Sequence, residues 1–149
     1  MAGNAKLTAA DLAVGDRRTQ RVAEELSRAQ IAQYAGASGD FNPIHVDEPH
    51  ATGVAGYPSV MAHGMLTMGL TARLLTDWFG DDVLKDFGVR FLAPVWPGDC
   101  LTVEGTVAAI DVDGDTAVVR VEIRTLNQHD APVVQGDATV ALPAKSHHA

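Results

Sequence analysis

The chain has 149 residues, of which 46% are apolar and 20% are charged. This length is typical of one domain, because a chain of about 150 residues can bury roughly 70% of its unfolded surface around a single core. Nineteen acidic residues against eleven Lys and Arg give a formal net charge of −8, which disfavours binding to nucleic acid or to an anionic membrane. We expect one domain over residues 1–149, with a core from about 10 to 142 and flexible termini.

Several kinds of site are excluded by their missing signatures. Cys100 is the only cysteine, so an intrachain disulfide and a CxxC zinc or redox site are both impossible. The GxGxxG, GxxxxGK[ST] and GxSxG motifs do not occur, and we therefore expect no cofactor. Residues 1–10 lack a secretory pattern and no apolar stretch is long enough to span a bilayer, so we expect a cytoplasmic protein without membrane contact.

Helical patterns dominate the first half of the chain. A short strand is expected at Thr19–Val22, and a helix is expected to begin at Ser27, a favoured N-cap residue, and to end at Gly36. Residues 37–58 are rich in Gly, Pro, Asn and Asp, which predicts a long loop with one helical turn near Glu48–Ala51. A loop of this length inside a compact domain is usually functional or disordered.

A longer helix and a set of strands follow. Residues 64–79 carry apolar side chains around most of the helix circumference, which predicts a buried helix that ends at Gly80. The apolar period then changes to two, which predicts strands near 87–92, 101–107, 117–124 and 134–142. Hairpin turns between the last three strands predict an antiparallel meander. We therefore expect the α+β class, with a curved antiparallel sheet wrapped around one central helix.

Asp40 and His45 are the first candidates for chemistry. They are five residues apart, and Asn42–Pro43 between them favours a turn that brings the carboxylate and the imidazole together. A carboxylate beside an imidazole suits general acid/base catalysis on a shared water molecule. The spacing alone leaves open the alternative that Asp40 caps a turn and His45 packs as an ordinary loop residue.

His63 and Gly64 are the second candidates, because they precede the long helix. The first turn of a helix has unsatisfied N–H groups, and a residue without a side chain lets a substrate carbonyl approach them, as in an oxyanion hole. The alternative is that Gly64 only permits tight packing. The spacing of His45, Asp47, His50 and His63 fits no metal-binding motif, so no metal site is predicted.

The element Asp40-x-Asn42-Pro43-x-His45, followed by His63–Gly64–Met65, resembles the hydratase motif of MaoC-like hot-dog-fold proteins. The resemblance extends through residues 88–91 and 97–99 and covers about residues 10–142. These proteins are (R)-specific enoyl-thioester hydratases and (3R)-hydroxyacyl-thioester dehydratases. The resemblance implies a hot-dog fold, which agrees with the α+β expectation from the periodicity.

The resemblance also implies roles for individual residues. Asp40 and His45 would hold the catalytic water, Asn42 would orient the loop or His45, and the Gly64 amide would polarise the thioester carbonyl. The implied reaction adds water to a trans-2-enoyl thioester and gives the (3R)-3-hydroxyacyl thioester. The substrate-binding residues that we expect are His63, Pro58 and Met65.

The same resemblance implies an acyl-CoA or acyl-carrier-protein thioester as substrate and a homodimer, with a heterodimer left open. This chain departs from the family pattern at one position. Some members carry a serine eight residues after the glycine, whereas this chain has Ala72 there, with Thr71 beside it. Two alternatives are a hot-dog acyl-CoA thioesterase and a subunit of a heterodimeric dehydratase. The thioesterase alternative is weakened because Asp77 is the only acid between Gly64 and Trp78.

Overall fold

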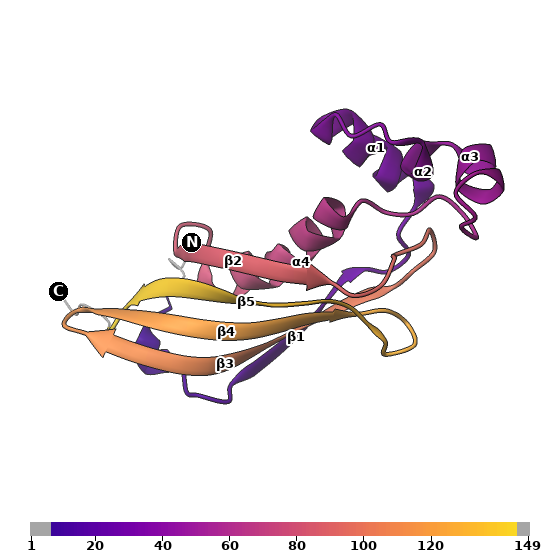
Figure 1. The fold of residues 1–149 in the computed structure, drawn as a ribbon. Helices are drawn as coiled ribbons and strands as arrows, with labels where there is room; N and C mark the ends of the chain where they lie inside the picture. The colour runs from indigo at the N-terminus through magenta and orange to yellow at the C-terminus, as the bar shows by residue number, and fades with distance from the viewer. Residues whose placement is uncertain (1–6, 146–149) are drawn as a thin grey trace, which may run out of the picture.

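The computed structural model describes residues 7–145, so most of the predicted flexible termini lie outside the described residues. Five strands form one antiparallel sheet in the order β1-β3-β4-β5-β2, and α4 lies against one face of it (Figure 1). The elements in chain order are η1 (Ala9–Asp11), β1 (Arg17–Ala23), α1 (Arg28–Ser38), α2 (Pro43–Val46), α3 (Glu48–Gly53), α4 (Gly64–Phe79), β2 (Leu84–Phe91), β3 (Leu101–Asp113), β4 (Thr116–Leu126) and β5 (Pro132–Pro143).

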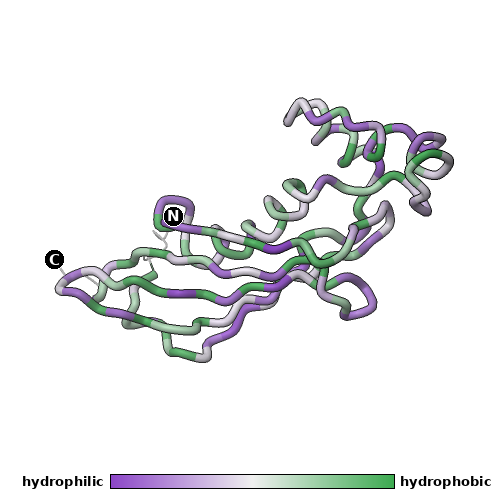
Figure 2. Tube along the Cα trace, in the orientation of Figure 1, coloured by the Kyte–Doolittle hydropathy of each residue, from purple (hydrophilic) through white to green (hydrophobic). Residues whose placement is uncertain are grey.

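Strands β3, β4 and β5 form the predicted meander. Their burial alternates with a period of two, and the turns fall between Asp113 and Thr116 and between Leu126 and Pro132. Hydrophobic residues recur along these strands and along α4 (Figure 2). The α+β prediction of a central helix on an antiparallel sheet is therefore confirmed.

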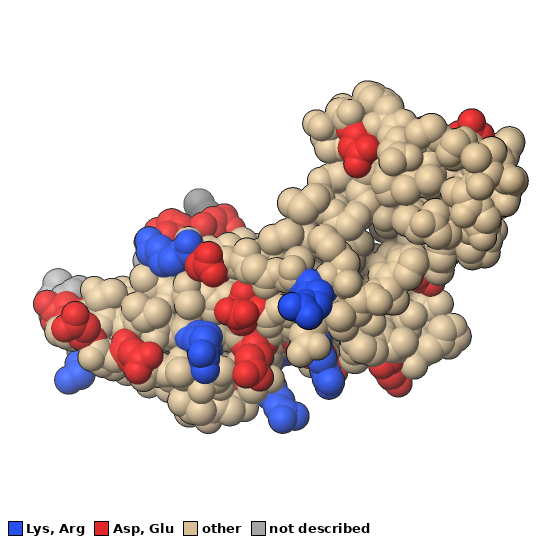
Figure 3. All heavy atoms as spheres, in the orientation of Figure 1, with Lys and Arg blue, Asp and Glu red and all other residues tan. Residues whose placement is uncertain are grey.

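The solvent face of the sheet carries charges of both signs. Glu104 of β3 and Arg124 of β4 are directly opposite each other, and the Arg124 Nε donates to the Glu104 Oε2 over 2.6 Å. Figure 3 shows blue and red side chains interspersed over the sheet, whereas fewer charges are visible at the end of the molecule that carries α1–α3. Acids and bases thus neutralise each other locally on this face.

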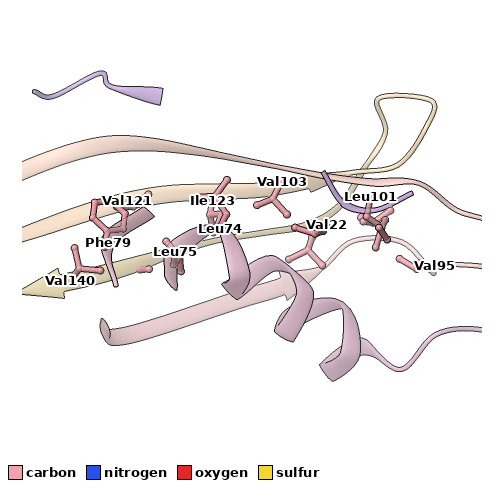
Figure 4. Packing of buried hydrophobic residues seen from close by; sticks show 14 of the residues in the cluster. Val22, Leu74, Leu75, Phe79, Val95, Leu101, Val103, Val121, Ile123 and Val140 are labelled. Atoms are coloured by element: carbon pink, nitrogen blue, oxygen red, sulfur yellow. The ribbon is translucent and has the colours of Figure 1, made fainter. Parts of the chain in front are cut away.

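Helix α4 provides one side of the hydrophobic core. Its buried residues Leu74, Leu75 and Phe79 pack with side chains from the inner face of the sheet, among them Val121 and Val140 (Figure 4). The prediction that this helix, apolar around most of its circumference, is buried rather than merely amphipathic is wrong. Its N-terminal turns rise away from the sheet toward α1–α3 (Figure 1), and Met65 is 57% exposed.

The first helix ends later than predicted. α1 continues through Gly36 to Ser38, and the C-cap is Gly39, whose φ of 76° places it in the left-handed region. The Gly39 N–H donates to the carbonyl of Ala35, which closes the last turn. Glycine is strongly favoured in this conformation, whereas Gly36 has ordinary helical neighbours and is only tolerated. Ser27 caps the other end, as the sequence predicted.

The predicted loop at 37–58 contains two short helices, of which α3 confirms the helical turn predicted near Glu48–Ala51 and α2 was not predicted. Asn42 caps α2 by accepting from the N–H of Ile44, and Asp47 caps α3 by accepting from the N–H of His50. A proline lies in the first turn of each helix, where its missing N–H costs nothing. The Asn, Asp and Pro residues that suggested a loop are therefore the residues that begin these two short helices.

A polar cluster ties α1 and α3 to the segment that follows them. The Arg28 Nη1 donates to the Glu48 Oε2 over 2.6 Å, and the same carboxylate accepts from the N–H of Val60 and the hydroxyl of Ser59. The Arg28 guanidinium and the Val60 N–H lower the pKa of Glu48 to about 2. We call these four residues, Arg28, Glu48, Ser59 and Val60, the Glu48 clamp.

Within residues 7–145, no helix combines the length and apolar character needed to cross a bilayer.

Candidate active site

Asp40 lies in the turn between α1 and α2, and His45 lies in α2 itself. The Asp40 Oδ1 accepts from the N–H of Asn42, and the Asn42 Oδ1 accepts from the N–H of Ile44, each over 3.2 Å. Asp40 thus stabilises the turn, as the alternative interpretation held. Its second carboxylate oxygen faces His45, and its side chain is 55% exposed, whereas that of His45 is 9% exposed.

The orientation of the His45 ring is determined by a main-chain carbonyl. The His45 Nδ1 lies 2.8 Å from the carbonyl oxygen of Met61, and because a carbonyl only accepts, Nδ1 carries the proton. In the neutral ring, Nε2 therefore presents its lone pair to Asp40, whose Oδ2 is 4.0 Å away. For a water oxygen about 2.8 Å from each of these atoms, the angle from Nε2 through the water oxygen to Oδ2 would be about 90°. Nε2 and Oδ2 could therefore accept one hydrogen each from the same water molecule.

His63 lies behind this pair. Its Nε2 lies 2.9 Å from the carbonyl oxygen of Asp40, and its ring stacks on the His45 ring with centroids 3.8 Å apart and planes inclined by 25°. Tyr34 of α1 packs on the His63 ring, with the two ring centroids 4.9 Å apart. His63 is 2% exposed, so its ring is enclosed by these neighbours.

Gly64 is the first residue of α4, directly after His63. The N-cap His63 makes no side-chain hydrogen bond to the helix, so the N–H groups of the first turn keep the unsatisfied donors and positive dipole of a helix N-terminus. An added Cβ at Gly64 would lie 3.1–3.3 Å from three ring carbons of Phe91 at the end of β2. Phe91 therefore packs directly over the Gly64 backbone.

Two other predicted site residues, Met65 and Pro58, are exposed, whereas Thr71, which was noted beside Ala72, is buried. Met65 projects from the same turn as Gly64 and is exposed. Pro58 is exposed in the segment after α3, and no hydrogen bond or ring contact found among residues 7–145 links it to the Asp40–His45 pair. The Thr71 hydroxyl donates to the carbonyl of Thr67 and lies 2.6 Å from the Thr125 hydroxyl, so it faces the sheet and is buried there.

The arrangement also bears on the metal question. Ligand-capable atoms of Asp40, His45 and His63 lie within 4.8 Å of one another, whereas Asp47 uses its carboxylate to cap α3. One nitrogen of each ring already bonds a main-chain carbonyl. The two rings are stacked, so their in-plane lone pairs lie in two separate, nearly parallel planes and cannot converge on one ion about 2.0–2.1 Å from each nitrogen. The geometry favours hydrogen bonding to a water molecule over chelation.

Three contributors to the site were given no role in the sequence analysis. The Met61 carbonyl sets the His45 tautomer, Tyr34 packs on His63, and Phe91 covers Gly64. A main-chain carbonyl has no residue-type preference, and the two aromatic contacts join segments that are far apart in the chain. The available signals were the aromatic character of Tyr34 and Phe91 and the place of Phe91 in the segment 88–91, to which the resemblance extends.

Comparison with known proteins identifies the family. The MaoC-like domain family matches residues 9–140. This chain belongs to that family. The (R)-specific enoyl-CoA hydratase of Aeromonas caviae is 32% identical over 139 residues, which cover 92% of this chain and 100% of that protein. The unliganded R-hydratase of Pseudomonas aeruginosa has a TM-score of 0.80 at 27% identity, covering 94% of this chain and 88% of that one.

MaoC-like domains also occur as parts of larger proteins. Mouse peroxisomal multifunctional enzyme type 2 is 37% identical over 102 residues, or 66% of this chain, but this chain spans only 14% of the length of that enzyme. The match to the hot-dog structures confirms the predicted fold, and the family match confirms the resemblance stated from the Asp40–His45 and His63–Met65 motifs.

Proposed function

We propose that this MaoC-like protein catalyses the reversible hydration of trans-2-enoyl thioesters to (3R)-3-hydroxyacyl thioesters, and so acts as a hydro-lyase of fatty-acid metabolism. One observation carries the proposal. The His45 Nε2 and the Asp40 Oδ2 face each other at 4.0 Å, and His63, which contacts both residues, is followed directly by the carbonyl-polarising candidate Gly64. The relatives named for this reaction support it.

The water-holding pair performs the proton transfers. Because the neutral His45 Nε2 and the Asp40 carboxylate both accept, a bound water donates both hydrogens and directs its lone pairs toward C3 of the substrate. The water oxygen bonds to C3, one water proton passes to the pair, and the electron pair of the C2=C3 bond moves toward the thioester. A proton from the pair then reaches C2, and dehydration reverses each step.

The carbonyl needs a donor because addition at C3 places enolate charge on the thioester oxygen. The Gly64 N–H, at the positive end of α4, is the donor that we assign to it. A single donor of this kind typically contributes about 10²–10³ in rate. The acyl group would then lie along the exposed face of the first turn of α4, where Met65 is located.

Exposed apolar side chains also support a homodimer as the working form. Besides Met65, the large apolar side chains Phe41, Phe91 and Leu92 are exposed in the single chain. A second copy that covers these residues would shield the reacting thioester from bulk water. Light scattering would test this proposal directly, and a monomer at working concentration would contradict it.

The thioesterase alternative lacks support at the site. Asp77, the acid considered for it, accepts from the Gln20 Nε2 over 2.6 Å. It lies thirteen residues after Gly64 on the same helix, which corresponds to about 20 Å along the axis. The carboxylate that is close to the first turn of α4 is instead Asp40, which is paired with His45.

The decisive experiment is the loss of ultraviolet absorbance of the conjugated enoyl group of crotonyl-CoA. Asp40→Asn and His45→Gln should each lower kcat by about 10²–10⁴, the usual contribution of a general acid or base. His129→Gln, an exposed histidine in the turn before β5, is the matched control and should keep full activity. Product analysis should show the (3R) isomer. A wild-type protein inactive on short and long enoyl thioesters would contradict the proposal.

A further inference from the structure

Among the side chains of Asp40, His45 and His63 at the site, that of His63 has the most constrained environment. Its ring is enclosed between Tyr34 and His45, and its Nε2 bonds the main-chain carbonyl of Asp40. Its Nδ1 is buried and has no hydrogen-bond partner among residues 7–145. A buried histidine nitrogen without a partner is uncommon, so the conformation must be held by the other contacts of the ring.

The hydrogen-bonding pattern defines the tautomer of His63. The Asp40 carbonyl only accepts, so the proton of the neutral ring is on Nε2, and the unpartnered Nδ1 carries the lone pair. A second proton on Nδ1 would create a buried donor without an acceptor. Neither nitrogen therefore faces a substrate or the water between Asp40 and His45, and the ring is not placed to transfer a proton.

The same ring restrains both partners of the catalytic pair. The Nε2–H bond fixes the backbone that carries the Asp40 carboxylate, and the stacking contact opposes rotation of His45 about its side-chain torsions. His63 is also the N-cap of α4, one peptide bond before Gly64. One residue thus connects the water-holding pair to the amide that would polarise the carbonyl.

We propose that His63 is a positioning residue of the hydration reaction, which sets the spacing between Asp40, His45 and the Gly64 amide without contacting the substrate. This inference rests on the proposed function. It replaces the expectation from the sequence that His63 binds substrate, because the ring is 2% exposed and its neighbours are protein groups. Displacing such groups by about 1 Å can lower a rate about 10²-fold.

Two substitutions separate the two contacts of the ring. His63→Gln keeps an N–H donor at nearly the position of Nε2 but removes the stacked ring. His63→Phe keeps a ring against His45 but removes the donor to Asp40. We expect kcat for crotonyl-CoA hydration to fall about ten- to hundredfold in both, with the smaller loss in His63→Gln, and KM to change less than about threefold. His129→Gln is again the matched control.

The pH profile of kcat distinguishes positioning from proton transfer. In both variants the profile should keep the shape of the wild-type profile at a lower height, because Asp40 and His45 still perform the proton transfers. Loss of one limb of the profile would assign proton transfer to His63 and overturn the proposal. A higher KM with kcat unchanged would show that the ring contacts the substrate, and full kcat in His63→Phe would show that the donor has no role.

A spectroscopic measurement on the wild-type protein tests the proposal without any variant. Imidazole ¹⁵N NMR should show His63 as the Nε2–H tautomer with a slowly exchanging ring proton, and should show the opposite tautomer for His45. An Nδ1–H tautomer at His63 would overturn the proposal even if both variants failed to fold. An inactive wild-type protein with the expected spectrum would contradict the proposed reaction but retain the positioning contact.

Discussion

Gly64→Ala tests whether the first amide of α4 must be open to the substrate. The added Cβ would lie 3.1–3.3 Å from three ring carbons of Phe91, whereas carbon atoms prefer a separation of about 3.5–4.0 Å. The Phe91 ring must therefore shift by about half an ångström, which its 48% exposed position permits. The methyl group would then occupy part of the approach to the amide.

The expected effect is large on catalysis and small on stability. Loss of one oxyanion donor typically lowers kcat about 10²–10³-fold, so we expect kcat/KM for crotonyl-CoA to fall about 10²-fold. Gly64 is the first residue of α4, so alanine gains less than the roughly 0.5–1 kcal/mol by which it is favoured over glycine in the middle of a helix, and this gain opposes the small cost of moving the exposed ring. The free energy of unfolding in urea should therefore change by less than about 1 kcal/mol.

Two further variants make this prediction refutable. Gly36→Ala is the matched control, because an added Cβ on α1 meets no atom within 4 Å, and it should keep full activity. Phe91→Ala in the Gly64→Ala background removes the contact but leaves the methyl group at the amide, so activity should stay low. Recovery of activity in that double variant would show that Gly64 only makes room for Phe91, and the assigned role of the amide would be wrong.

Two other predictions concern stability. Arg28 helps to lower the pKa of Glu48 in the folded state to about 2, so the ionised carboxylate stabilises the fold fully above pH 4.5, its ordinary pKa, and this stabilisation is lost as the pH falls toward 2. Glu48→Gln should therefore lower the free energy of unfolding at pH 7. In urea titrations, the difference in this free energy between the variant and wild type should shrink between pH 4.5 and pH 2. Thr71→Val leaves the buried Thr125 hydroxyl without its acceptor and should cost about 1–3 kcal/mol, whereas Thr125→Val should cost less, because Thr71 still donates to a main-chain carbonyl. Equal costs would contradict this assignment of donors.

The periodicity of the sequence predicted the sheet and the central helix because both are defined by local patterns. Strands β3–β5 alternate with a period of two, and α4 begins and ends at the residues that the pattern indicated. The exposure of Met65 could not be predicted in this way. It depends on how far α4 extends past the sheet, which is a property of the packed molecule.

The site was predictable in composition but not in geometry. Asp40 and His45 are only five residues apart in the chain, and Asn42 and Pro43 between them favour a turn. His63 reaches them only because the chain returns after α3, with the Met61 N–H bonded to the Ile44 carbonyl and the Met61 carbonyl bonded to His45. Helix α3 was predicted as one helical turn near Glu48–Ala51. Helix α2 was missed because an Asn before a proline is equally suited to a turn and to a helix N-cap.

The location of α1–α3 has a consequence for how the protein loses activity. These helices extend beyond the end of the sheet (Figure 1), and the Glu48 clamp and the contacts of His63 join them to the segment before α4. Local opening of such a peripheral unit requires less free energy than global unfolding, whereas the core strands exchange only when the whole domain unfolds. We therefore expect mild denaturant to abolish turnover while β3–β5 remain protected from hydrogen exchange, although Ile31 of α1 contributes to the core cluster.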